Sequence, residues 1–203
     1  MQLFHSPTTP FGRKVMVLLL ETGQAGDVEV ITASGTPTDP GSMPVDRNPL
    51  GKIPALVLDD GQAIYDSRVI CRYLDARAGG RLYPEPPRLW QTLTLEATAD
   101  GMLDAAILMV YEARIRPEEK RHEPWVEGQW GKVARALDAL EARWLDHLNG
   151  PLDMGQVAVG CALSYLDFRH VARNWRSGRP GLAAWYQGFS ARENMRLTEP
   201  PAA

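Results

Sequence analysis

The spacing of hydrophobic and polar positions divides the chain near residue 80. Before that point, short apolar runs typical of strands alternate with runs at helical spacing, and after it only helical spacing continues. Residues 2–5 predict a first strand, residues 11–22 a helix that follows Pro10, and residues 28–31 a second strand. Residues 34–48 are rich in Pro, Gly, Ser, Thr and Asp, so they predict at most a short, irregular helix.

A hairpin and a further helix complete this first half. Residues 55–58 and 62–64 flank Asp59-Asp60-Gly61, and an Asp-Gly pair between two apolar runs favours a β-hairpin. A helix over residues 67–77 follows. The order βαβαββα, with the irregular helix included, places a parallel pair and an antiparallel hairpin in one mixed, four-stranded sheet.

The second half predicts a helical bundle. Residues 78–87 hold two glycines and three prolines and read as a linker, which gives an α/β domain over residues 1–77 and an all-α domain over residues 88–203. Asp153 stands three residues before Gln156, a spacing typical of a capping box. The expected helical runs are 88–114, 124–148, 157–166 and 182–191.

Composition limits the partners. The chain has 22 basic and 25 acidic side chains and a net charge of −3, so no basic field favours nucleic acid or an anionic membrane. Cys71 and Cys161 stand far apart, which excludes a disulfide framework and a CxxC redox pair. With no leader or membrane-spanning run visible, we expect a cytoplasmic protein.

Two further groups of side chains are expected to have ordinary roles. Arg13 and Lys14, just inside the first helix, are of a type that is usually solvated. The four histidines, His5, His122, His147 and His170, lack the spacing of metal ligands, so surface or packing roles are expected and no metal site is predicted.

Three segments carry a resemblance to a known family. They run from Ser6 to Lys14, from Asn48 to Leu56 and from Ile64 to Ser67. With the order of domains, these motifs resemble the cytosolic glutathione S-transferases, in particular bacterial members with a Ser/Thr-type active-site turn. The resemblance covers nearly the whole chain and implies a thioredoxin-like first domain that binds glutathione, followed by a helical domain.

The resemblance also implies which residues hold glutathione. The Ile53-Pro54 bond would be cis, which leaves the backbone N–H and C=O of Ile53 free to pair with the cysteinyl backbone of the tripeptide. Lys52 belongs to the same segment. At the start of the next helix, Ser67 would hold the γ-glutamyl carboxylate and Asp66 the amino group. The alternative for Ser67 is a simple N-cap.

The resemblance further implies a catalytic hydroxyl in the first turn. A free thiol has a pKa of about 8.5, and family members lower it with a Tyr, Ser or Cys after the first strand. No Tyr precedes Tyr65 and no Cys precedes Cys71 here, so Ser6, Thr8 and Thr9 remain. Thr9, directly before Pro10, stands where related sequences have Ser or Cys and is the first candidate, with Ser6 second. A role of Thr9 as a helix cap is the alternative.

The expected activity is attack of the glutathione thiolate on a small hydrophobic electrophile, typical of detoxification. Glutathione is then a co-substrate, and without a catalytic cysteine a thioltransferase is not expected. A peroxidase, an isomerase or a non-catalytic interaction module with the same fold remains an alternative. The resemblance also implies a homodimer and a second-substrate cleft between the domains. Four side chains of the first long helix could line that cleft or pack in the core: Trp90, Met102, Met109 and Tyr111.

Overall fold

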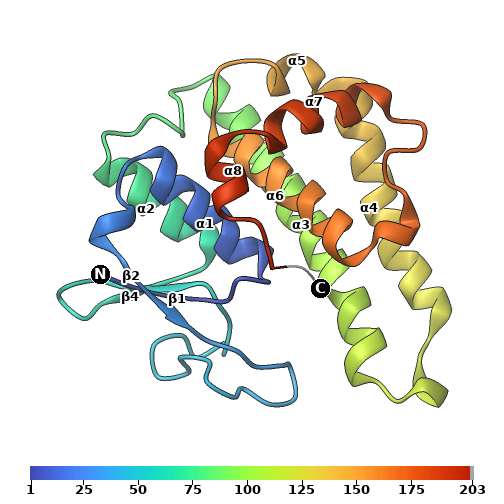
Figure 1. The fold of residues 1–203 in the computed structure, drawn as a ribbon, viewed down its shortest axis with the longest axis horizontal. Helices are drawn as coiled ribbons and strands as arrows, with labels where there is room; N and C mark the ends of the chain where they lie inside the picture. The colour runs from blue at the N-terminus through green and yellow to red at the C-terminus, as the bar shows by residue number, and fades with distance from the viewer. Residues whose placement is uncertain (202–203) are drawn as a thin grey trace. The chain divides into compact units, whose positions relative to one another are not determined.

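The computed structural model describes residues 1–201 (Figure 1). Residues 202 and 203, which the sequence prediction includes in the helical domain, lie outside this description. The chain forms two compact units: residues 1–86 with the described residues from 193 onward, and residues 87–192. The sequence prediction groups the residues after 192 with the helical domain, whereas their contacts lie with the first unit.

The first unit contains the predicted mixed four-stranded sheet, in the order β2-β1-β3-β4. β1 is parallel to β2, while β3 is antiparallel to both β1 and β4. The helices α1 and α2 pack against each other on one face of this sheet (Figure 1). The bounds are β1 Gln2–His5, α1 Pro10–Glu21, β2 Glu29–Thr32, β3 Ala55–Val57, β4 Ala63–Ile64 and α2 Ser67–Arg77.

Two connections show how local sequence sets the backbone. The hairpin between β3 and β4 turns at Gly61, whose φ of 87° lies in the left-handed region that favours glycine. The Asp60 carboxylate accepts the Gln62 N–H at 2.9 Å and closes this turn. Between β2 and β3, residues 34–48 form turns and one isolated bridge, so the irregular helix predicted there is not a regular α-helix.

The helix α1 buries two cations as well as its apolar face. Arg13 is 5% exposed and Lys14 is fully buried, so the expectation that both are solvated is wrong. The Arg13 guanidinium donates to the Met195 carbonyl at 2.8 Å and to the Thr198 hydroxyl at 3.2 Å. These contacts attach α8 (Glu193–Leu197), which the sequence prediction missed, to α1.

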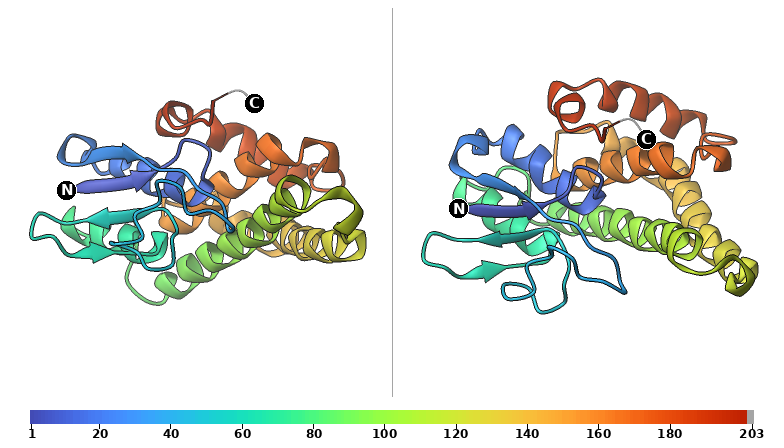
Figure 2. Two further views of the ribbon diagram at one scale, coloured as in Figure 1. Left: turned by 90° about the horizontal axis from the view of Figure 1, so that it is seen from below. Right: turned by 60° about the horizontal axis from the view of Figure 1, so that its bottom comes forward.

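The second unit is built around α6, which is buried on every side from Met154 to Leu166. α6 lies along α3, and α4 packs on the other side of α3 (Figures 1 and 2). The predicted single helix over residues 124–148 is wrong, because it breaks at Trp144. The bounds are α3 Arg88–Ile115, α4 Glu123–Arg143, α5 Leu145–Leu148, α6 Met154–Arg169 and α7 Pro180–Ser190. Short 3₁₀ turns lie at Glu118–Lys120 and Val171–Arg173 in this unit and at Ala25–Asp27 in the first.

The predicted capping box at the start of α6 is confirmed. Asp153 accepts the Gln156 N–H at 3.2 Å, and the Gln156 side chain accepts the Asp153 N–H. The second oxygen of Asp153 accepts hydrogen bonds from Arg88 and Thr92, both at 3.0 Å, and lies 2.7 Å from His147 Nε2. Asp153 is 1% exposed, so this network fixes the entry to α6 in the interior of the unit.

Candidate functional site

The register of the sheet brings the three motif segments to one of its ends. Phe4 pairs with Ala55, and Leu56 pairs with Ile64. Continuing this antiparallel register by one or two residues sets the end of β1 beside Ile53 and Pro54, and these beside Asp66. The turn after β1, the start of β3 and the start of α2 therefore meet at the same end of the sheet.

The turn after β1 leaves one hydroxyl group without a partner. Thr9 is the residue before α1, with φ −90° and ψ 122°, and its side chain makes no capping hydrogen bond. Its N–H donates to the Ser6 carbonyl at 3.0 Å, but its hydroxyl bonds to no residue between 1 and 201. The Ser6 hydroxyl, in contrast, lies 3.3 Å from that of Thr8. The alternative role of Thr9 as a side-chain cap is therefore not realised.

A close contact beneath this turn was missed from the sequence. His5 is 8% exposed, and a Cβ placed on Gly12 would lie 2.1 Å from His5 Nδ1 and 2.8 Å from the Thr9 methyl carbon. Only glycine leaves room for the ring and the methyl group together. The available signal was Gly12 itself, since glycine inside a helix costs about 1 kcal/mol relative to alanine and needs a packing reason.

The environment of His5 favours its neutral form. Burial lowers its pKa to about 4. Its Nδ1 atom is buried and has no hydrogen-bond partner in the described part of the chain. The ring therefore acts at neutral pH as an uncharged packing group between β1 and α1.

The start of β3 presents an unpaired stretch of backbone. The Ile53-Pro54 peptide bond is cis, as the resemblance implies. Ile53 is half-buried, and neither its N–H nor its C=O bonds to another residue of the described chain. The neighbouring Lys52 is exposed, and its carbonyl accepts the Asn48 side-chain N–H at 2.8 Å. An extended ligand could add to this backbone as a short strand.

At the start of α2, Asp66 rather than Ser67 is the cap. The Asp66 carboxylate accepts the Arg68 N–H at 2.9 Å and an Arg68 guanidinium N–H at 3.2 Å. Ser67 is the first helical residue and is 3% exposed. Its hydroxyl donates to no other residue among 1–201, so the alternative that Ser67 is an N-cap is wrong. The Tyr65-Asp66 bond is also cis.

The arrangement suits a peptide that carries negative charge. Two helices, α1 and α2, begin at this end of the sheet, and each helix start offers unpaired N–H groups with a partial positive charge. The Thr9 and Ser67 hydroxyls stand at those starts and lack protein partners. Ile53 adds a donor and an acceptor for an extended backbone.

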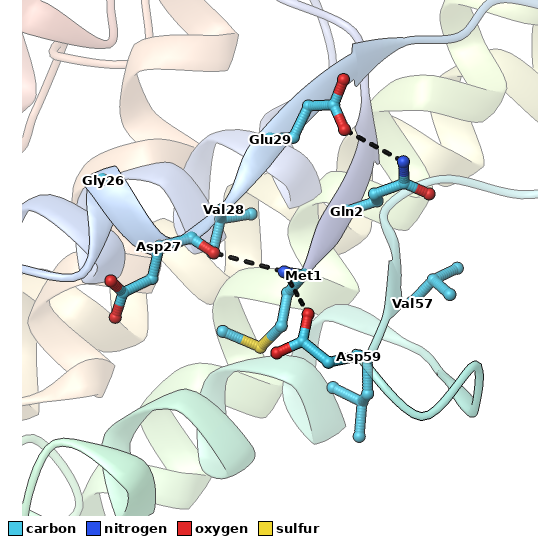
Figure 3. Close-up of a pocket in the computed structure, with 9 residues that line it drawn as sticks. Met1, Gln2, Gly26, Asp27, Val28, Glu29, Val57 and Asp59 are labelled. Atoms are coloured by element: carbon cyan, nitrogen blue, oxygen red, sulfur yellow. Dashed lines mark hydrogen bonds and ion pairs between the residues drawn. The ribbon is translucent and has the colours of Figure 1, made fainter.

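A different hollow lies at the opposite end of the same sheet, where β1 and β2 begin and β3 ends. Figure 3 shows the Met1 ammonium group donating to Asp59 at 2.8 Å and to the Asp27 carbonyl at 3.3 Å. The hydrogen bond from the Met1 ammonium group to Asp59 holds the pKa of the Asp59 carboxyl below its usual range. With Asp27, Glu29 and Asp59 around it, the hollow is acidic and does not favour an anionic peptide.

Residues 1–201 contain neither a group of metal ligands nor a membrane-spanning helix. Between residues 1 and 201, no three or more His, Cys, Asp or Glu side chains are grouped as metal ligands, and the expectation of a metal-free protein stays a prediction. No helix in that range is both long enough and apolar enough to cross a membrane.

Comparison with known proteins identifies relatives along the whole chain. Residues 8–77 match the model of the glutathione S-transferase N-terminal domain, and residues 123–188 match that of the C-terminal domain. The uncharacterized GST-like protein YibF of Escherichia coli K12 is 34% identical over 207 residues, covering all of both chains.

Solved structures agree with this result. A glutathione transferase family member from Pseudomonas fluorescens Pf-5, with bound glutathione, is 48% identical with a TM-score of 0.97 and covers 99% of each chain. A second structure from that organism, with bound S-(propanoic acid)-glutathione, is 47% identical with a TM-score of 0.93 and covers 100% of each.

Proposed function

Because this chain belongs to the glutathione S-transferase family, we propose that it binds glutathione at the end of the sheet where α1 and α2 begin, and activates the thiol. The observation that carries this proposal is the pair of unengaged hydroxyls, Thr9 and Ser67, at two helix starts beside the unpaired backbone of Ile53. The relatives from Pseudomonas fluorescens, which hold glutathione or its S-propanoate conjugate, support it.

Each charged or polar part of the tripeptide would meet a protein group of complementary charge or hydrogen-bonding type. We propose that Ser67, with the N–H groups at the start of α2, receives the γ-glutamyl carboxylate. Asp66 uses the remaining acceptor capacity of its carboxylate for the α-amino group. Ile53 pairs with the cysteinyl backbone beside Pro54, and the exposed Lys52 ammonium can meet the glycine carboxylate.

The sulfur would then lie at the Thr9 turn. A hydroxyl donor to a thiolate contributes about 1.5–3 kcal/mol, and the start of α1 about 0.3–1 kcal/mol more. Together these correspond to a fall of about one to three units from a thiol pKa of about 8.5, sufficient for a thiolate at neutral pH. Thr9 is favoured over Ser6 because the Ser6 hydroxyl lies 3.3 Å from that of Thr8, while Thr9 has no partner.

The reaction supported best is nucleophilic attack by this thiolate on an electrophilic carbon. The S-propanoate conjugate in the relative is a thioether of glutathione, the kind of product that such an attack forms. Protein groups then supply position and a lowered thiol pKa. A cytoplasmic location and assembly as a homodimer belong to the same proposal, and gel filtration measures the dimer.

Isothermal titration with reduced glutathione tests the proposal. We expect binding to the wild type, and Ser67→Ala to weaken it about tenfold by removing one hydrogen bond to a carboxylate. Cysteinylglycine, which lacks the γ-glutamyl carboxylate, is the matched control ligand, and its weaker binding should not change with Ser67→Ala. Absence of glutathione binding at millimolar concentration would contradict the proposal.

A further inference from the structure

The two heavy atoms on Cβ of Thr9 have different surroundings. The methyl carbon lies over the start of α1, 2.8 Å from the position of a Cβ on Gly12, the third residue of that helix. The hydroxyl oxygen bonds to no residue between 1 and 201. It reaches the surface, because among the buried and half-buried residues of that range only His5 Nδ1 is a fully enclosed side-chain polar atom without a partner. The methyl group therefore packs inward, and the hydroxyl is left accessible to a ligand.

The methyl group takes the place where the oxygen of an ordinary cap would lie. A Thr or Ser before a helix commonly accepts the N–H of the second or third helical residue with its hydroxyl. Thr9 makes no such hydrogen bond, and its methyl group covers the third residue, Gly12, instead. The missing side chain of Gly12 leaves the room that this methyl group needs.

The backbone of the turn is fixed on both sides of the Thr9 side chain. The Thr9 N–H donates to the Ser6 carbonyl at 3.0 Å, and the Thr9 carbonyl accepts the Arg13 N–H at 3.0 Å. Its φ of −90° and ψ of 122° belong to the extended region that a following proline favours. The direction of the hydroxyl therefore depends on rotation about the Cα–Cβ bond, which has three staggered positions.

His5 closes the space on the other side of Gly12. Its Nδ1 atom lies 2.1 Å from the same Cβ position, so the ring and the Thr9 methyl group border one point from two sides. The His5 backbone is anchored in the sheet, since it pairs with Thr32 of β2 and its carbonyl accepts the Ala33 N–H at 2.9 Å. Because Nδ1 has no hydrogen-bond partner in the described chain, the ring acts on its neighbours by its shape.

We infer that Gly12 and His5 are positioning residues, which hold the Thr9 methyl group over α1 and thereby turn the hydroxyl toward bound glutathione. This inference rests on the proposed function. Because the Cβ atom of threonine is chiral, its methyl group and hydroxyl turn together, and a rotamer that moves the methyl group off Gly12 also moves the hydroxyl. Serine has no methyl group, so the direction of its hydroxyl does not depend on the residue at position 12.

The pKa of the bound thiol, measured by ultraviolet pH titration of the glutathione complex, tests this dependence. Gly12→Ala places a Cβ 2.8 Å from the methyl carbon, so the Thr9 hydroxyl should turn away. We expect the pKa to rise by about one unit, which means about tenfold less thiolate at a pH below both pKa values. Thr9→Ser/Gly12→Ala should have the pKa of Thr9→Ser alone. Gly128→Ala, where nothing lies within 4 Å of the new Cβ, is the matched control.

Two further variants decide the matter if the His5 ring disturbs the fold of Gly12→Ala. In His5→Ala/Gly12→Ala the ring contact is gone and the methyl contact remains, so most of the stability should return while the thiol pKa stays raised. His5→Leu, which replaces the ring by a side chain of similar bulk, should keep the wild-type pKa. The inference is overturned if the pKa is unchanged in His5→Ala/Gly12→Ala, if it rises in His5→Leu, or if the rise in Gly12→Ala persists together with Thr9→Ser.

A measurement without glutathione separates this inference from the proposed function. In isotope-labelled protein, three-bond NMR couplings from the Thr9 methyl carbon to its backbone nitrogen and carbonyl carbon report the rotamer directly. We expect one rotamer in the wild type and in Gly128→Ala, and a different or averaged one in Gly12→Ala. An unchanged rotamer in Gly12→Ala overturns the inference even where glutathione binds. A changed rotamer in a protein that does not bind glutathione upholds the effect of Gly12 on Thr9 and contradicts the proposed function alone.

Discussion

Replacement of Gly12 by alanine tests the packing beneath the Thr9 turn. The new Cβ would lie 2.1 Å from His5 Nδ1 and 2.8 Å from the Thr9 methyl carbon, both far inside contact distance. His5 is 8% exposed at the end of β1, so its ring cannot swing into solvent without opening the core. Either the ring or the first turn of α1 must therefore move.

The sign of the expected effect is opposite to that of an ordinary glycine in a helix. Glycine to alanine at an open helical position stabilises by about 1 kcal/mol. Overpacking of a buried site costs about 1–3 kcal/mol, and here it meets a rigid ring and a β-branched side chain. With a cost in the upper part of that range, about 2–3 kcal/mol, we expect Gly12→Ala to lower the free energy of unfolding by about 1–2 kcal/mol net.

Urea unfolding measures this change, with Gly128→Ala as the matched control, because nothing lies within 4 Å of a Cβ at that position of α4. In the double variant His5→Ala/Gly12→Ala the closest contact, with the ring, is gone and only that with the Thr9 methyl carbon remains, so most of the loss should be recovered with a coupling energy of about 1–2 kcal/mol. The reasoning is refuted if Gly12→Ala is as stable as Gly128→Ala, or if the two substitutions are simply additive.

Three other predictions follow from the structure. Asp153→Ala should lower the free energy of unfolding by about 3 kcal/mol or more, because Arg88 loses its carboxylate partner, His147 Nε2 loses its hydrogen bond and α6 loses its cap. Asp153→Asn, which keeps an acceptor, should cost less in the same urea assay. His5 has a folded-state pKa lowered from 6.5 to about 4, so the unfolded chain takes up the proton first. The contribution of neutral His5 to the free energy of unfolding is therefore fully present above about pH 6.5, and up to about 3 kcal/mol of it is lost as the pH drops to about 4. His5→Ala should flatten this part of the pH–stability curve. Ser67→Ala should weaken glutathione binding but change the free energy of unfolding in urea by no more than about 0.5 kcal/mol, because the Ser67 hydroxyl has no partner among residues 1–201. A large loss of stability would show a structural role instead.

Much of the fold could be predicted because its signals are local. Alternation at residues 2–5, the Asp-Gly turn before Gln62 and the Asp153–Gln156 spacing each depend on neighbours in sequence. The break of α4 at Trp144 was missed because the apolar period continues through it and no glycine or proline marks it. The burial of Lys14 was missed because burial depends on what packs against a helix rather than on its own sequence.

The candidate site was predictable in its segments and not in its details. The motifs gave the positions of Thr9, Ile53 and Ser67, and the sheet register then explains why these segments meet. Sequence could not tell that Asp66 caps α2, because either neighbour is a good cap. The His5–Gly12 contact joins a strand to a helix, and such a pairing has no signal in the order of residues.

The central claim is that the Thr9 hydroxyl stabilises the thiolate of bound glutathione. Its most direct test is an ultraviolet pH titration of the thiolate in the glutathione complex of the wild type, Thr9→Ser, Thr9→Ala and Ser6→Ala. We expect Thr9→Ala to raise the pKa of the bound thiol by about one to two units, as for loss of one hydrogen bond to an anion, with Thr9→Ser and Ser6→Ala close to the wild type. An unchanged pKa in Thr9→Ala, or a larger rise in Ser6→Ala, would contradict the account.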